Sequence, residues 1–334
     1  MAMTLAEMKV GMNDKVSQQV VDTFIRMSEV LEMLPFDDSV SPGGGSTLTY
    51  GYVQKKLPST AAFRAINAEY TANQATVEKK TVDLKVFGGS FEIDRVIKEA
   101  EGQYNNMALQ IEEKVKAAIG TFHNALINGD SASDANAFDG LDKFLVGKTT
   151  EFGIGSIIDL SSIENIKNNA DTFYEALLKL INSTGAQALM MNEDMKTKIQ
   201  TVARVLGYKT ESEEAFGRVI TTIGENKVRL IDLKNVYSVS SDAPVETPVI
   251  GKKSRKVPSS ASSETAGLTD IYAVRFNVLD GFHGVSLKGD SAVKTYLPDF
   301  NTPGAVKKGE VEMVAAVALK NTRAAGVLRN IKVV

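Results

Sequence analysis

Side chains that commonly carry out catalysis are scarce in this sequence. It contains no cysteine and only two histidines, His123 and His283. Without cysteine there is no disulfide, no thiolate nucleophile and no cysteine-ligated zinc or iron–sulfur cluster. A catalytic zinc ion held by three histidines of one chain is excluded as well. We expect His123 to lie half-buried on a helix and His283 to begin a strand, because neither stands in a catalytic motif.

Other groups that could bind or transform a ligand lack the required spacing. The segment Gly251–Ser254 ends in Lys-Ser, but it has no upstream glycine of a phosphate-binding loop. The basic cluster at 252–256 has no interleaved aromatic residues that could stack on nucleic-acid bases. Glu112 and Lys116 have the spacing of an ion pair on an exposed helix face. The sequence therefore predicts no cofactor and no metal site.

Composition and charge are those of a globular protein. The chain has 334 residues, of which 43% are hydrophobic and 24% are charged, and its formal net charge is −3. This length corresponds to about two domains, and the charge argues against a strongly basic nucleic-acid coat. No run of 18 apolar residues is present, so no transmembrane helix is predicted. The first residues lack the charged-then-apolar order of a signal peptide.

The elements that would position a site begin with an acidic arm. Apolar residues between Val20 and Leu34 recur every three or four positions and predict one helix, which Pro35 ends. Residues 1–40 contain seven acidic and three basic residues. The glycine run at 43–45 indicates a loop or hinge after the arm.

An extended hairpin is predicted next. Residues 48–52 and 82–86 alternate in the manner of strands, and a long segment of weak periodicity lies between them. Two strands alone are marginally stable in water, so we expect this hairpin to lie on a surface outside itself. Gly88-Gly89 predicts a bend where the hairpin ends.

One long helix and an α/β region make up most of the remaining chain. Apolar residues from Ala108 to Leu126 form a helical stripe and predict a helix over about 105–128. Helical and strand patterns then alternate over 151–294, where residues 240–270 are expected to form a long exposed loop.

The last part of the chain is predicted to be mostly strand. Asp280-Gly281 between two strand-like runs predicts a β-hairpin. Short apolar runs at 313–319 and 326–334 predict two further strands.

This order of elements resembles that of tailed-bacteriophage major capsid proteins with the HK97-type fold. The resemblance covers nearly the whole chain and rests on the order and length of the elements. It is most specific in the passage Thr81–Gly129, in Phe138–Leu141, and in Ile271–Gly289 with the strand segment that follows. It implies an α+β fold with an N-terminal arm, an extended β-hairpin loop, a peripheral domain with a long spine helix, and an axial α/β domain.

The resemblance also implies the limits of these parts. Residues 1–44 would form the N-terminal arm, and residues 45–90 the extended loop that lies over a neighbouring subunit. Residues 91–150 and 295–334 would form the peripheral domain, the latter as returning C-terminal strands. Residues 151–294 would form the axial domain at the centre of a capsomer.

The implied function is structural and not enzymatic. Such a protein assembles into the icosahedral or prolate head of a tailed phage, is made in the host bacterial cytoplasm, and ends in the virion capsid. Its partners would be copies of itself in hexamers and pentamers, a portal protein, and packaged double-stranded DNA held by non-specific contacts. About 45 residues precede the hairpin, so we expect any scaffolding protein to be separate. No cofactor and no membrane are implied.

Two kinds of contact between subunits follow from the resemblance. Some relatives form an isopeptide cross-link between a hairpin lysine and a peripheral-domain asparagine. Lys55, Lys56, Asn321 and Asn330 are of the required types in the corresponding regions.

The second kind is an ion pair between the arm and the C-terminal stretch. Residues 304–334 contain six basic and two acidic residues, and the resemblance brings them under the acidic arm of another subunit. We expect Asp22, Glu29 or Glu32 as the acidic partners and Arg323 or Arg329 as the basic ones.

Two other functions fit the sequence. An encapsulin-type nanocompartment shell protein has the same fold and encloses a protein cargo. A carboxylate-based α/β enzyme is the second alternative, against which the missing cysteine and the scarce histidine argue.

Overall fold

The computed structural model describes residues 28–41, 47–57, 59–99, 106–208, 211–215, 218–224, 226–240, 243–288 and 293–334. The helices in these ranges are α2 (Glu29–Met33), α3 (Arg95–Glu99), α4 (Asn106–Asn128), α5 (Leu141–Leu145), α6 (Ile163–Thr184), α7 (Glu193–Val205) and the 3-10 turn η1 (Thr322–Ala324). The strands of the first half are β1 (Phe36–Val40), β2 (Thr49–Leu57), β3 (Thr76–Asp83), β4 (Lys85–Asp94), β5 (Glu151–Phe152) and β6 (Ile158–Asp159). Those of the second half are β7 (Ala188–Met191), β8 (Glu211–Ala215), β9 (Arg218–Ile223), β10 (Val228–Asp232), β11 (Asn235–Ser240), β12 (Ala243–Pro248), β13 (Lys253–Arg255), β14 (Thr265–Val274), β15 (Phe282–Leu287), β16 (Val293–Tyr296), β17 (Val306–Leu319) and β18 (Ala325–Lys332).

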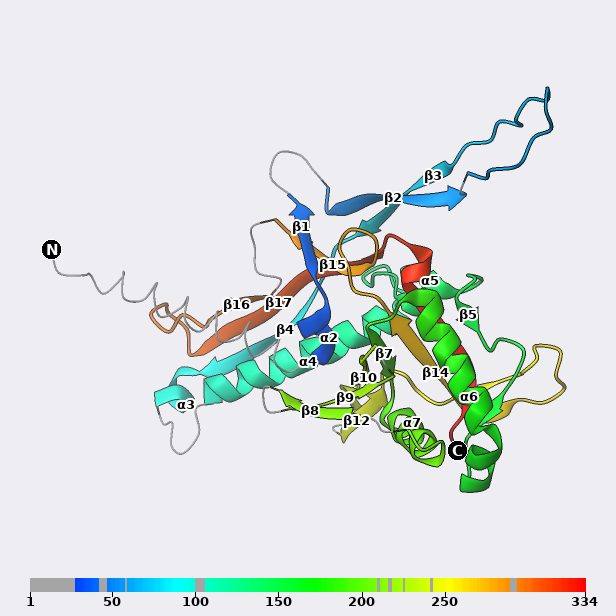
Figure 1. The fold of residues 1–334 in the computed structure, drawn as a ribbon. Coiled ribbons are helices and arrows are strands. Elements are labelled where there is room, and N and C mark those ends of the chain that lie inside the picture. The colour runs from blue at the N-terminus through cyan, green and yellow to red at the C-terminus, as the bar shows by residue number, and fades with distance from the viewer. Residues whose placement is uncertain are drawn as a thin grey trace.

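A five-stranded sheet lies along the long helix α4 (Figure 1). Its central strand β17 pairs with β4 on one edge and with β15 and β16 on the other, and β1 adds to β15 in parallel. The predicted stripe of α4 is confirmed, because Ile111, Val115, Phe122 and Leu126 are all buried. They form one core with the inner face of this sheet.

Glycine lets two of these strands approach each other. Gly88 lies inside β4, opposite Glu312 of β17, and a Cβ at Gly88 would overlap the carbonyl oxygen of Val311. The predicted bend at Gly88-Gly89 is therefore wrong: the glycines are needed for strand pairing and not for a turn.

A mixed nine-stranded sheet forms the second part of the molecule. Its main path is β5-β18-β14-β7-β10-β9-β8, in which β7 and β10 are parallel and β14 is antiparallel to both neighbours. The helices α6 and α7 bury one stripe each against it, and these stripes belong to a second core. Ser162 caps α6 and Asn192 caps α7, each accepting a backbone N–H with its side chain.

Two two-stranded hairpins lie outside the large sheets. The predicted extended hairpin is confirmed as β2 and β3, which pair from Thr49–Asp83 to Leu57–Thr76, but the returning strand ends at Asp83 and residues 85–86 begin β4. It projects from the body, and its tip lies far from the rest of the chain (Figure 1). A second hairpin, β11–β12, occupies part of the range 240–270, so the prediction of one long loop there is wrong in part.

The predicted hairpin around Asp280-Gly281 is wrong. β14 pairs with β7, β13 and β18, whereas β15 pairs with β1 and β17. The turn therefore carries the chain from the nine-stranded to the five-stranded sheet. The turn residues alone do not predict this passage between sheets, because both strands are almost fully buried and pair with strands distant in the sequence.

The strands predicted at 313–319 and 326–334 are confirmed as β17 and β18, but the arm differs from expectation. Most of the predicted arm helix lies outside the described residues, and the described part is the short helix α2 followed by β1, a strand that was not predicted. Strand pairing divides the chain differently from the expected limits at 151–294 and 295–334. β15 belongs to the five-stranded sheet, and β18 belongs to the nine-stranded sheet.

Candidate functional site

The extended hairpin has two different faces. On the inner face, Tyr50 and Tyr52 are buried against the body, and the Gln54 amide donates a hydrogen bond to the Leu319 carbonyl oxygen at 3.1 Å. On the outer face, Val53 is opposite Lys79, and Lys55 is opposite Val77. Both valines are about two-thirds exposed, at 64% and 67%. The hairpin thus presents a mixed apolar and basic surface to the outside.

The base of the hairpin is fixed to the body by a polar junction. The Tyr50 hydroxyl donates to Asp37 Oδ2 of β1 at 2.7 Å, and Lys320 Nζ lies 3.9 Å from the same oxygen. Burial, followed by the hydrogen bond to Asp37, raises the pKa of Tyr50, so its hydroxyl stays a donor. His283 lies edge-on to the Tyr50 ring, with a centroid distance of 5.8 Å. The junction joins the arm strand, the hairpin and the end of β17.

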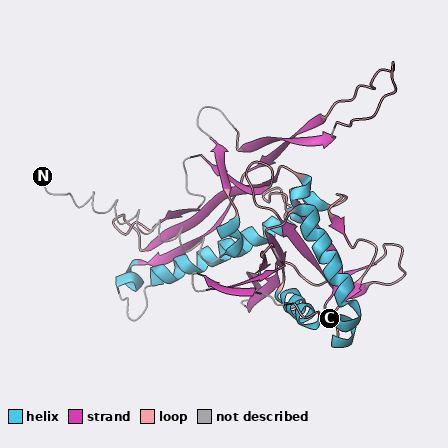
Figure 2. Cartoon of the chain, viewed as in Figure 1, coloured by secondary structure: helices cyan, strands magenta, loops and turns pink. Residues whose placement is uncertain are grey.

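The tip of the hairpin carries unburied apolar side chains. Residues 59–75 form no helix or strand, and Phe63, Ile66 and Tyr70 are exposed by 107%, 91% and 64%. In Figure 2 the whole tip is drawn as loop. Within the described residues it packs against no other element, so its apolar area is available to a partner.

An acidic and apolar patch lies on the five-stranded sheet, on the face away from α4. We call this patch the outer sheet face. Alternation along β17 and its partners β4 and β16 places on it Glu92, Asp94, Lys294, Tyr296, Val306, Lys308, Glu310 and Glu312. Its four carboxylates and two lysines give it a net charge of −2. Tyr296 and Val306 are exposed by 50% and 55%.

The hairpin and the outer sheet face are complementary but lie at opposite ends of the subunit. The span Thr49–Asp83 contains five basic and three acidic residues, a net charge of +2. Figure 1 shows its tip at the upper right, while β16 and the start of β17 lie at the left end, near α3. The two surfaces of one chain are therefore too far apart to meet.

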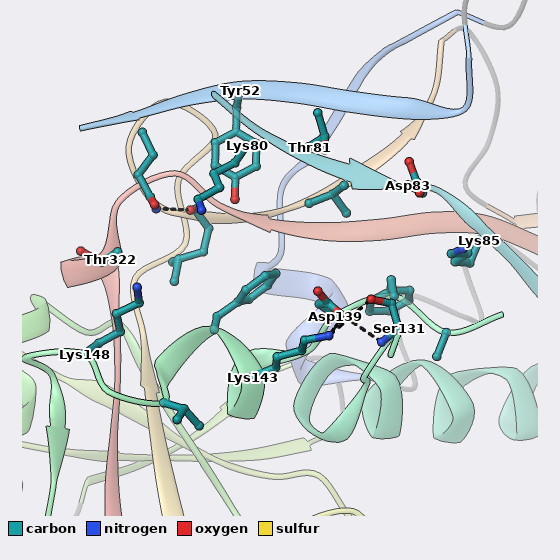
Figure 3. Close-up of a pocket in the computed structure, with 17 residues that line it drawn as sticks. Tyr52, Lys80, Thr81, Asp83, Lys85, Ser131, Asp139, Lys143, Lys148 and Thr322 are labelled. Carbon is teal, nitrogen blue, oxygen red and sulfur yellow. Dashed lines mark hydrogen bonds and ion pairs between the residues drawn. The ribbon is translucent and has the colours of Figure 1, made fainter. Parts of the chain in front are cut away.

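A cleft of about 380 Å³ lies between the hairpin and the segment around α5 (Figure 3). Its lysine Lys143 points at Asp139, 2.9 Å away, and also contacts Asp130 at 2.5 Å. This ammonium group, with backbone and hydroxyl donors, lowers the pKa of Asp130 to about 2. Partial burial of Asp139 opposes its charge, but hydrogen bonds from Ser131 and Lys143 likewise lower the pKa of Asp139, so its carboxylate stays charged.

A buried charge cluster contains Arg329, one of the expected contact residues. Its guanidinium lies 2.7 Å from Asp142 Oδ1 and 3.4 Å from Asp270 Oδ2, and it also contacts Glu151. Burial opposes its charge, but Asp142 and the other carboxylates raise the pKa of Arg329. Arg329 of β18 thus joins α5 to β5 and β14 of the nine-stranded sheet within one subunit, which leaves it little surface for another chain.

The other expected ion-pair residues lie at separate places. Arg323 is exposed on η1, between β17 and β18. Glu32 lies 3.8 Å from Arg229 of the same chain, and Glu29 precedes it on α2. Asp22 lies outside the described residues. Arg323 and Glu32 are exposed, whereas Glu29 is half-buried.

The expected cross-linking residues differ in exposure. Lys55 and Lys56 are exposed on β2. Asn330 is buried, and its amide donates to the Gly153 carbonyl oxygen at 2.8 Å. Asn321 is half-buried and accepts the Arg323 N–H with its side chain. Asn321 is thus more accessible than Asn330 to a lysine from outside the subunit.

The two histidines are structural in their surroundings. His123 is more buried than predicted, and its Nε2 lies 2.7 Å from the Ser28 hydroxyl. Burial lowers the pKa of His123 to about 4, so the ring is neutral at pH 7. His283 lies in β15 and is fully buried. Over the described ranges, no three His, Asp or Glu side chains are grouped to hold a metal ion.

Sequence reasoning missed the outer sheet face. The alternation of Lys308, Glu310 and Glu312 with buried neighbours was available as a signal. However, the pairing of β17 with β4 joins residues more than 200 positions apart, and no local pattern predicts such a contact. Among the helices that the structure describes, none combines the length and hydropathy needed to cross a bilayer.

Comparison with solved structures gives matches along nearly the whole chain. The encapsulin SrpI of Synechococcus elongatus matches 92% of this chain and 88% of its own, with 13% identity and a TM-score of 0.55. A chain of Mycobacterium phage Bobi matches 90% of both chains, with 12% identity and a TM-score of 0.52. A capsid chain of a native GTA particle matches 90% of this chain and 89% of its own, with 10% identity and a TM-score of 0.51.

The chain has the HK97-like capsid fold. The long helix α4 beside a sheet, the projecting hairpin and the separate α/β part occur in the order that the sequence suggested. At these identities the likeness concerns the fold. No family model and no curated protein sequence matches the chain.

Proposed function

We propose that this protein is the repeating subunit of a closed shell, and specifically the major capsid protein of a tailed bacteriophage, which encloses double-stranded DNA. The observation that carries the proposal is the placement of the basic, partly apolar hairpin and the acidic, partly apolar outer sheet face at opposite ends of one subunit. A contact between two different patches does not stop at an isolated pair: it generates rings when the rotation closes and open filaments when it does not. The shared fold supports the same conclusion.

The parts of the subunit would then have distinct roles. Residues 1–44 would act as an arm and residues 45–90 as the loop that reaches a neighbour. The five-stranded sheet with α4 would form the peripheral domain, and the nine-stranded sheet would form the axial domain at the centre of hexamers and pentamers. A separate scaffolding protein, a portal protein and DNA held without base contacts would be its partners in the virion capsid, after synthesis in the bacterial host.

Electron microscopy of the purified full chain tests the shell. We expect closed particles, tubes or capsomers, with a scaffolding protein supplied if required. A monomer under all salt and protein concentrations would contradict the proposal. The contact itself is tested by Glu310→Lys, which should reduce assembly, and by adding Lys79→Glu in the same chain, which should restore part of it. Glu175→Lys, a charge change on the exposed side of α6, is the matched control.

An encapsulin-type shell is the second candidate, and the match to SrpI over most of both chains favours it. The contents of the particle separate the two. Nuclease-protected DNA inside purified particles is expected for a phage capsid. A co-purifying protein cargo without nucleic acid would favour the encapsulin type.

A further inference from the structure

The tip of the hairpin, residues 59–75, has the composition of a helix although it forms none in the subunit. Six of the sixteen residues 60–75 are alanine, the residue with the highest helix propensity, and none is glycine or proline. Pro58 precedes the segment, and Ser59 and Thr60 are suitable helix-capping residues. The strand pairing of β2 and β3 ends at Leu57–Thr76, so the segment is not held in the hairpin ladder.

The apolar residues of the tip have helical spacing. Phe63, Ile66 and Tyr70 lie at positions i, i+3 and i+7, which places them on one side of a helix. In the subunit they contact no core, and the backbone makes a single turn, from the Ala68 N–H to the Ala65 carbonyl oxygen. Asn67 has a positive φ of 64°, which interrupts a helix at this turn. An isolated helix of this length is only marginally stable in water, so we expect the free tip not to be helical.

A surface that could cover this apolar side exists on the outer sheet face. Tyr296 and Val306 are about half exposed there. The carboxylates Glu92, Glu310 and Glu312 surround them, opposite in charge to the lysines Lys55, Lys56, Lys79 and Lys80 that flank the tip. Because the tip and this face lie at opposite ends of one subunit (Figure 1), the face must belong to a second copy of the chain.

We propose that residues 60–72 are a latent amphipathic helix, which folds when Phe63, Ile66 and Tyr70 dock on the outer sheet face of a second copy while Leu57 and Thr76 stay paired. This inference rests on the proposed self-assembly. The ordering of the tip would be coupled to the contact.

Hydrogen exchange on the full chain tests the fold of the tip. In free subunits, amides 60–75 should exchange at the rate of an unstructured peptide. In assemblies, consecutive amides from Arg64 onward should be slowed at least a hundredfold, since a helix protects every amide in its interior. Protection of alternate amides would indicate a docked strand and would overturn the helix. An unprotected tip in well-formed particles would overturn the docking as well.

Proline substitution separates helix formation from apolar contact. Ala65→Pro leaves all three apolar side chains in place but blocks a helix interior, and we expect at least a tenfold loss of assembly yield. Ala61→Pro lies in the first turn, where proline is tolerated, and should assemble normally. Ile66→Ser removes one of the apolar contacts, so it should reduce the assembly yield as Ala65→Pro does. If Ile66→Ser fails but Ala65→Pro assembles, the tip docks without a helix and the inference is wrong.

The two proposals can fail separately. If the wild-type chain forms only open oligomers, the closed shell is wrong, but protection of the tip that rises with protein concentration would still support the latent helix. If the chain remains monomeric and the tip unprotected at every concentration, both are wrong. Circular dichroism and thermal melting of free Ala65→Pro should match wild type, because the tip buries nothing in the subunit.

Discussion

His123 shows how much a single buried side chain can contribute to this fold. His123 is held between the Ser28 hydroxyl, which caps the arm helix α2, and the Leu233 carbonyl oxygen, 3.4 Å from Nδ1. One imidazole therefore links the arm, the long helix α4 and the segment after β10. Because burial disfavours the charged ring, this link requires a neutral histidine.

The subunit should lose stability in mild acid through His123. Its pKa of about 4 in the folded state lies below the ordinary value of 6.5, so the unfolded chain binds the proton more readily. The stabilisation is complete above pH 6.5 and falls as the pH drops toward 4. Between pH 8 and pH 5 the loss should be about 2 kcal/mol of unfolding free energy, measured by urea titration of unassembled subunits. His123→Gln should be less stable at pH 8 but should lack this part of the pH dependence, and an unchanged slope would contradict the assignment.

Arg323 is the residue at which we expect an ion pair between subunits. It is exposed on η1, whereas Arg329 is already held by three carboxylates of its own chain. Each exposed pair is worth about 0–1 kcal/mol, but a shell repeats it many times. Arg323→Glu should slow assembly and make it more sensitive to salt, as followed by light scattering.

Controls for Arg323→Glu lie on both sides of the contact. Arg204→Glu, at the exposed end of α7, should assemble normally. Adding Glu32→Lys, a charge reversal at an exposed arm residue, to Arg323→Glu should restore part of the rate. If Arg323→Glu assembles with wild-type yield and salt response, the arm does not pair with this residue.

At the scale of elements, the contact between β4 and β17 depends on residues without side chains. Gly88 lies against the Val311 carbonyl oxygen, and Gly309 of β17 lies against the ring of Phe91. A methyl group at Gly88 would push the two strands apart, and one at Gly309 would displace the ring of Phe91. The outer sheet face is built on this strand pair, so its geometry depends on the same glycines.

Gly88→Ala should therefore destabilise the subunit by about 1–3 kcal/mol, the usual range for overpacking. Gly155→Ala is the matched control, because no atom lies within 4 Å of its added methyl group. The control should stay within about 0.5 kcal/mol of wild type. Chemical denaturation of free subunits measures both, and equal stability of the two variants would show that β4 can shift without penalty.

Local patterns predicted those elements whose partners are near in sequence or whose burial is one-sided. The stripe of α4 and the strands of the extended hairpin follow from periodicity, because one side of each is buried. The crossing at Asp280-Gly281 could not be predicted in this way. β14 is buried along most of its length. Its sequence is mostly apolar without alternation, and it does not indicate which strands pair with it.

The candidate site was predictable only in part for the same reason. Lys55 and Lys56 were expected on the hairpin surface, and they are exposed there. The outer sheet face required knowledge that Glu92 and Lys308 stand opposite each other. Arg329 was expected at a subunit contact because of its charge, but its carboxylate partners come from three separate segments of its own chain.

For the whole molecule, the charge limits the contact with nucleic acid. The net charge is −3, and the basic residues of the hairpin are balanced by the acidic outer sheet face. Affinity for duplex DNA comes mainly from neutralised phosphates, and this subunit offers few cations in excess. We expect no detectable binding of free subunits to duplex DNA at physiological salt, by fluorescence anisotropy. A footprint at a defined DNA sequence would show that the protein recognises bases, and it would contradict a shell that contacts its DNA only non-specifically.

The separation of the hairpin from the surface it fits has a consequence for mixed populations. In the proposed contact, a chain lacking the outer half of the hairpin would keep its outer sheet face, so it would receive a neighbour but could not reach the next one. Each such chain would act as a terminator at the point where it enters. In six-membered rings, one truncated chain in ten leaves roughly half of the rings free of a terminator. A small fraction of truncated chain should therefore reduce the assembly yield by much more than that fraction.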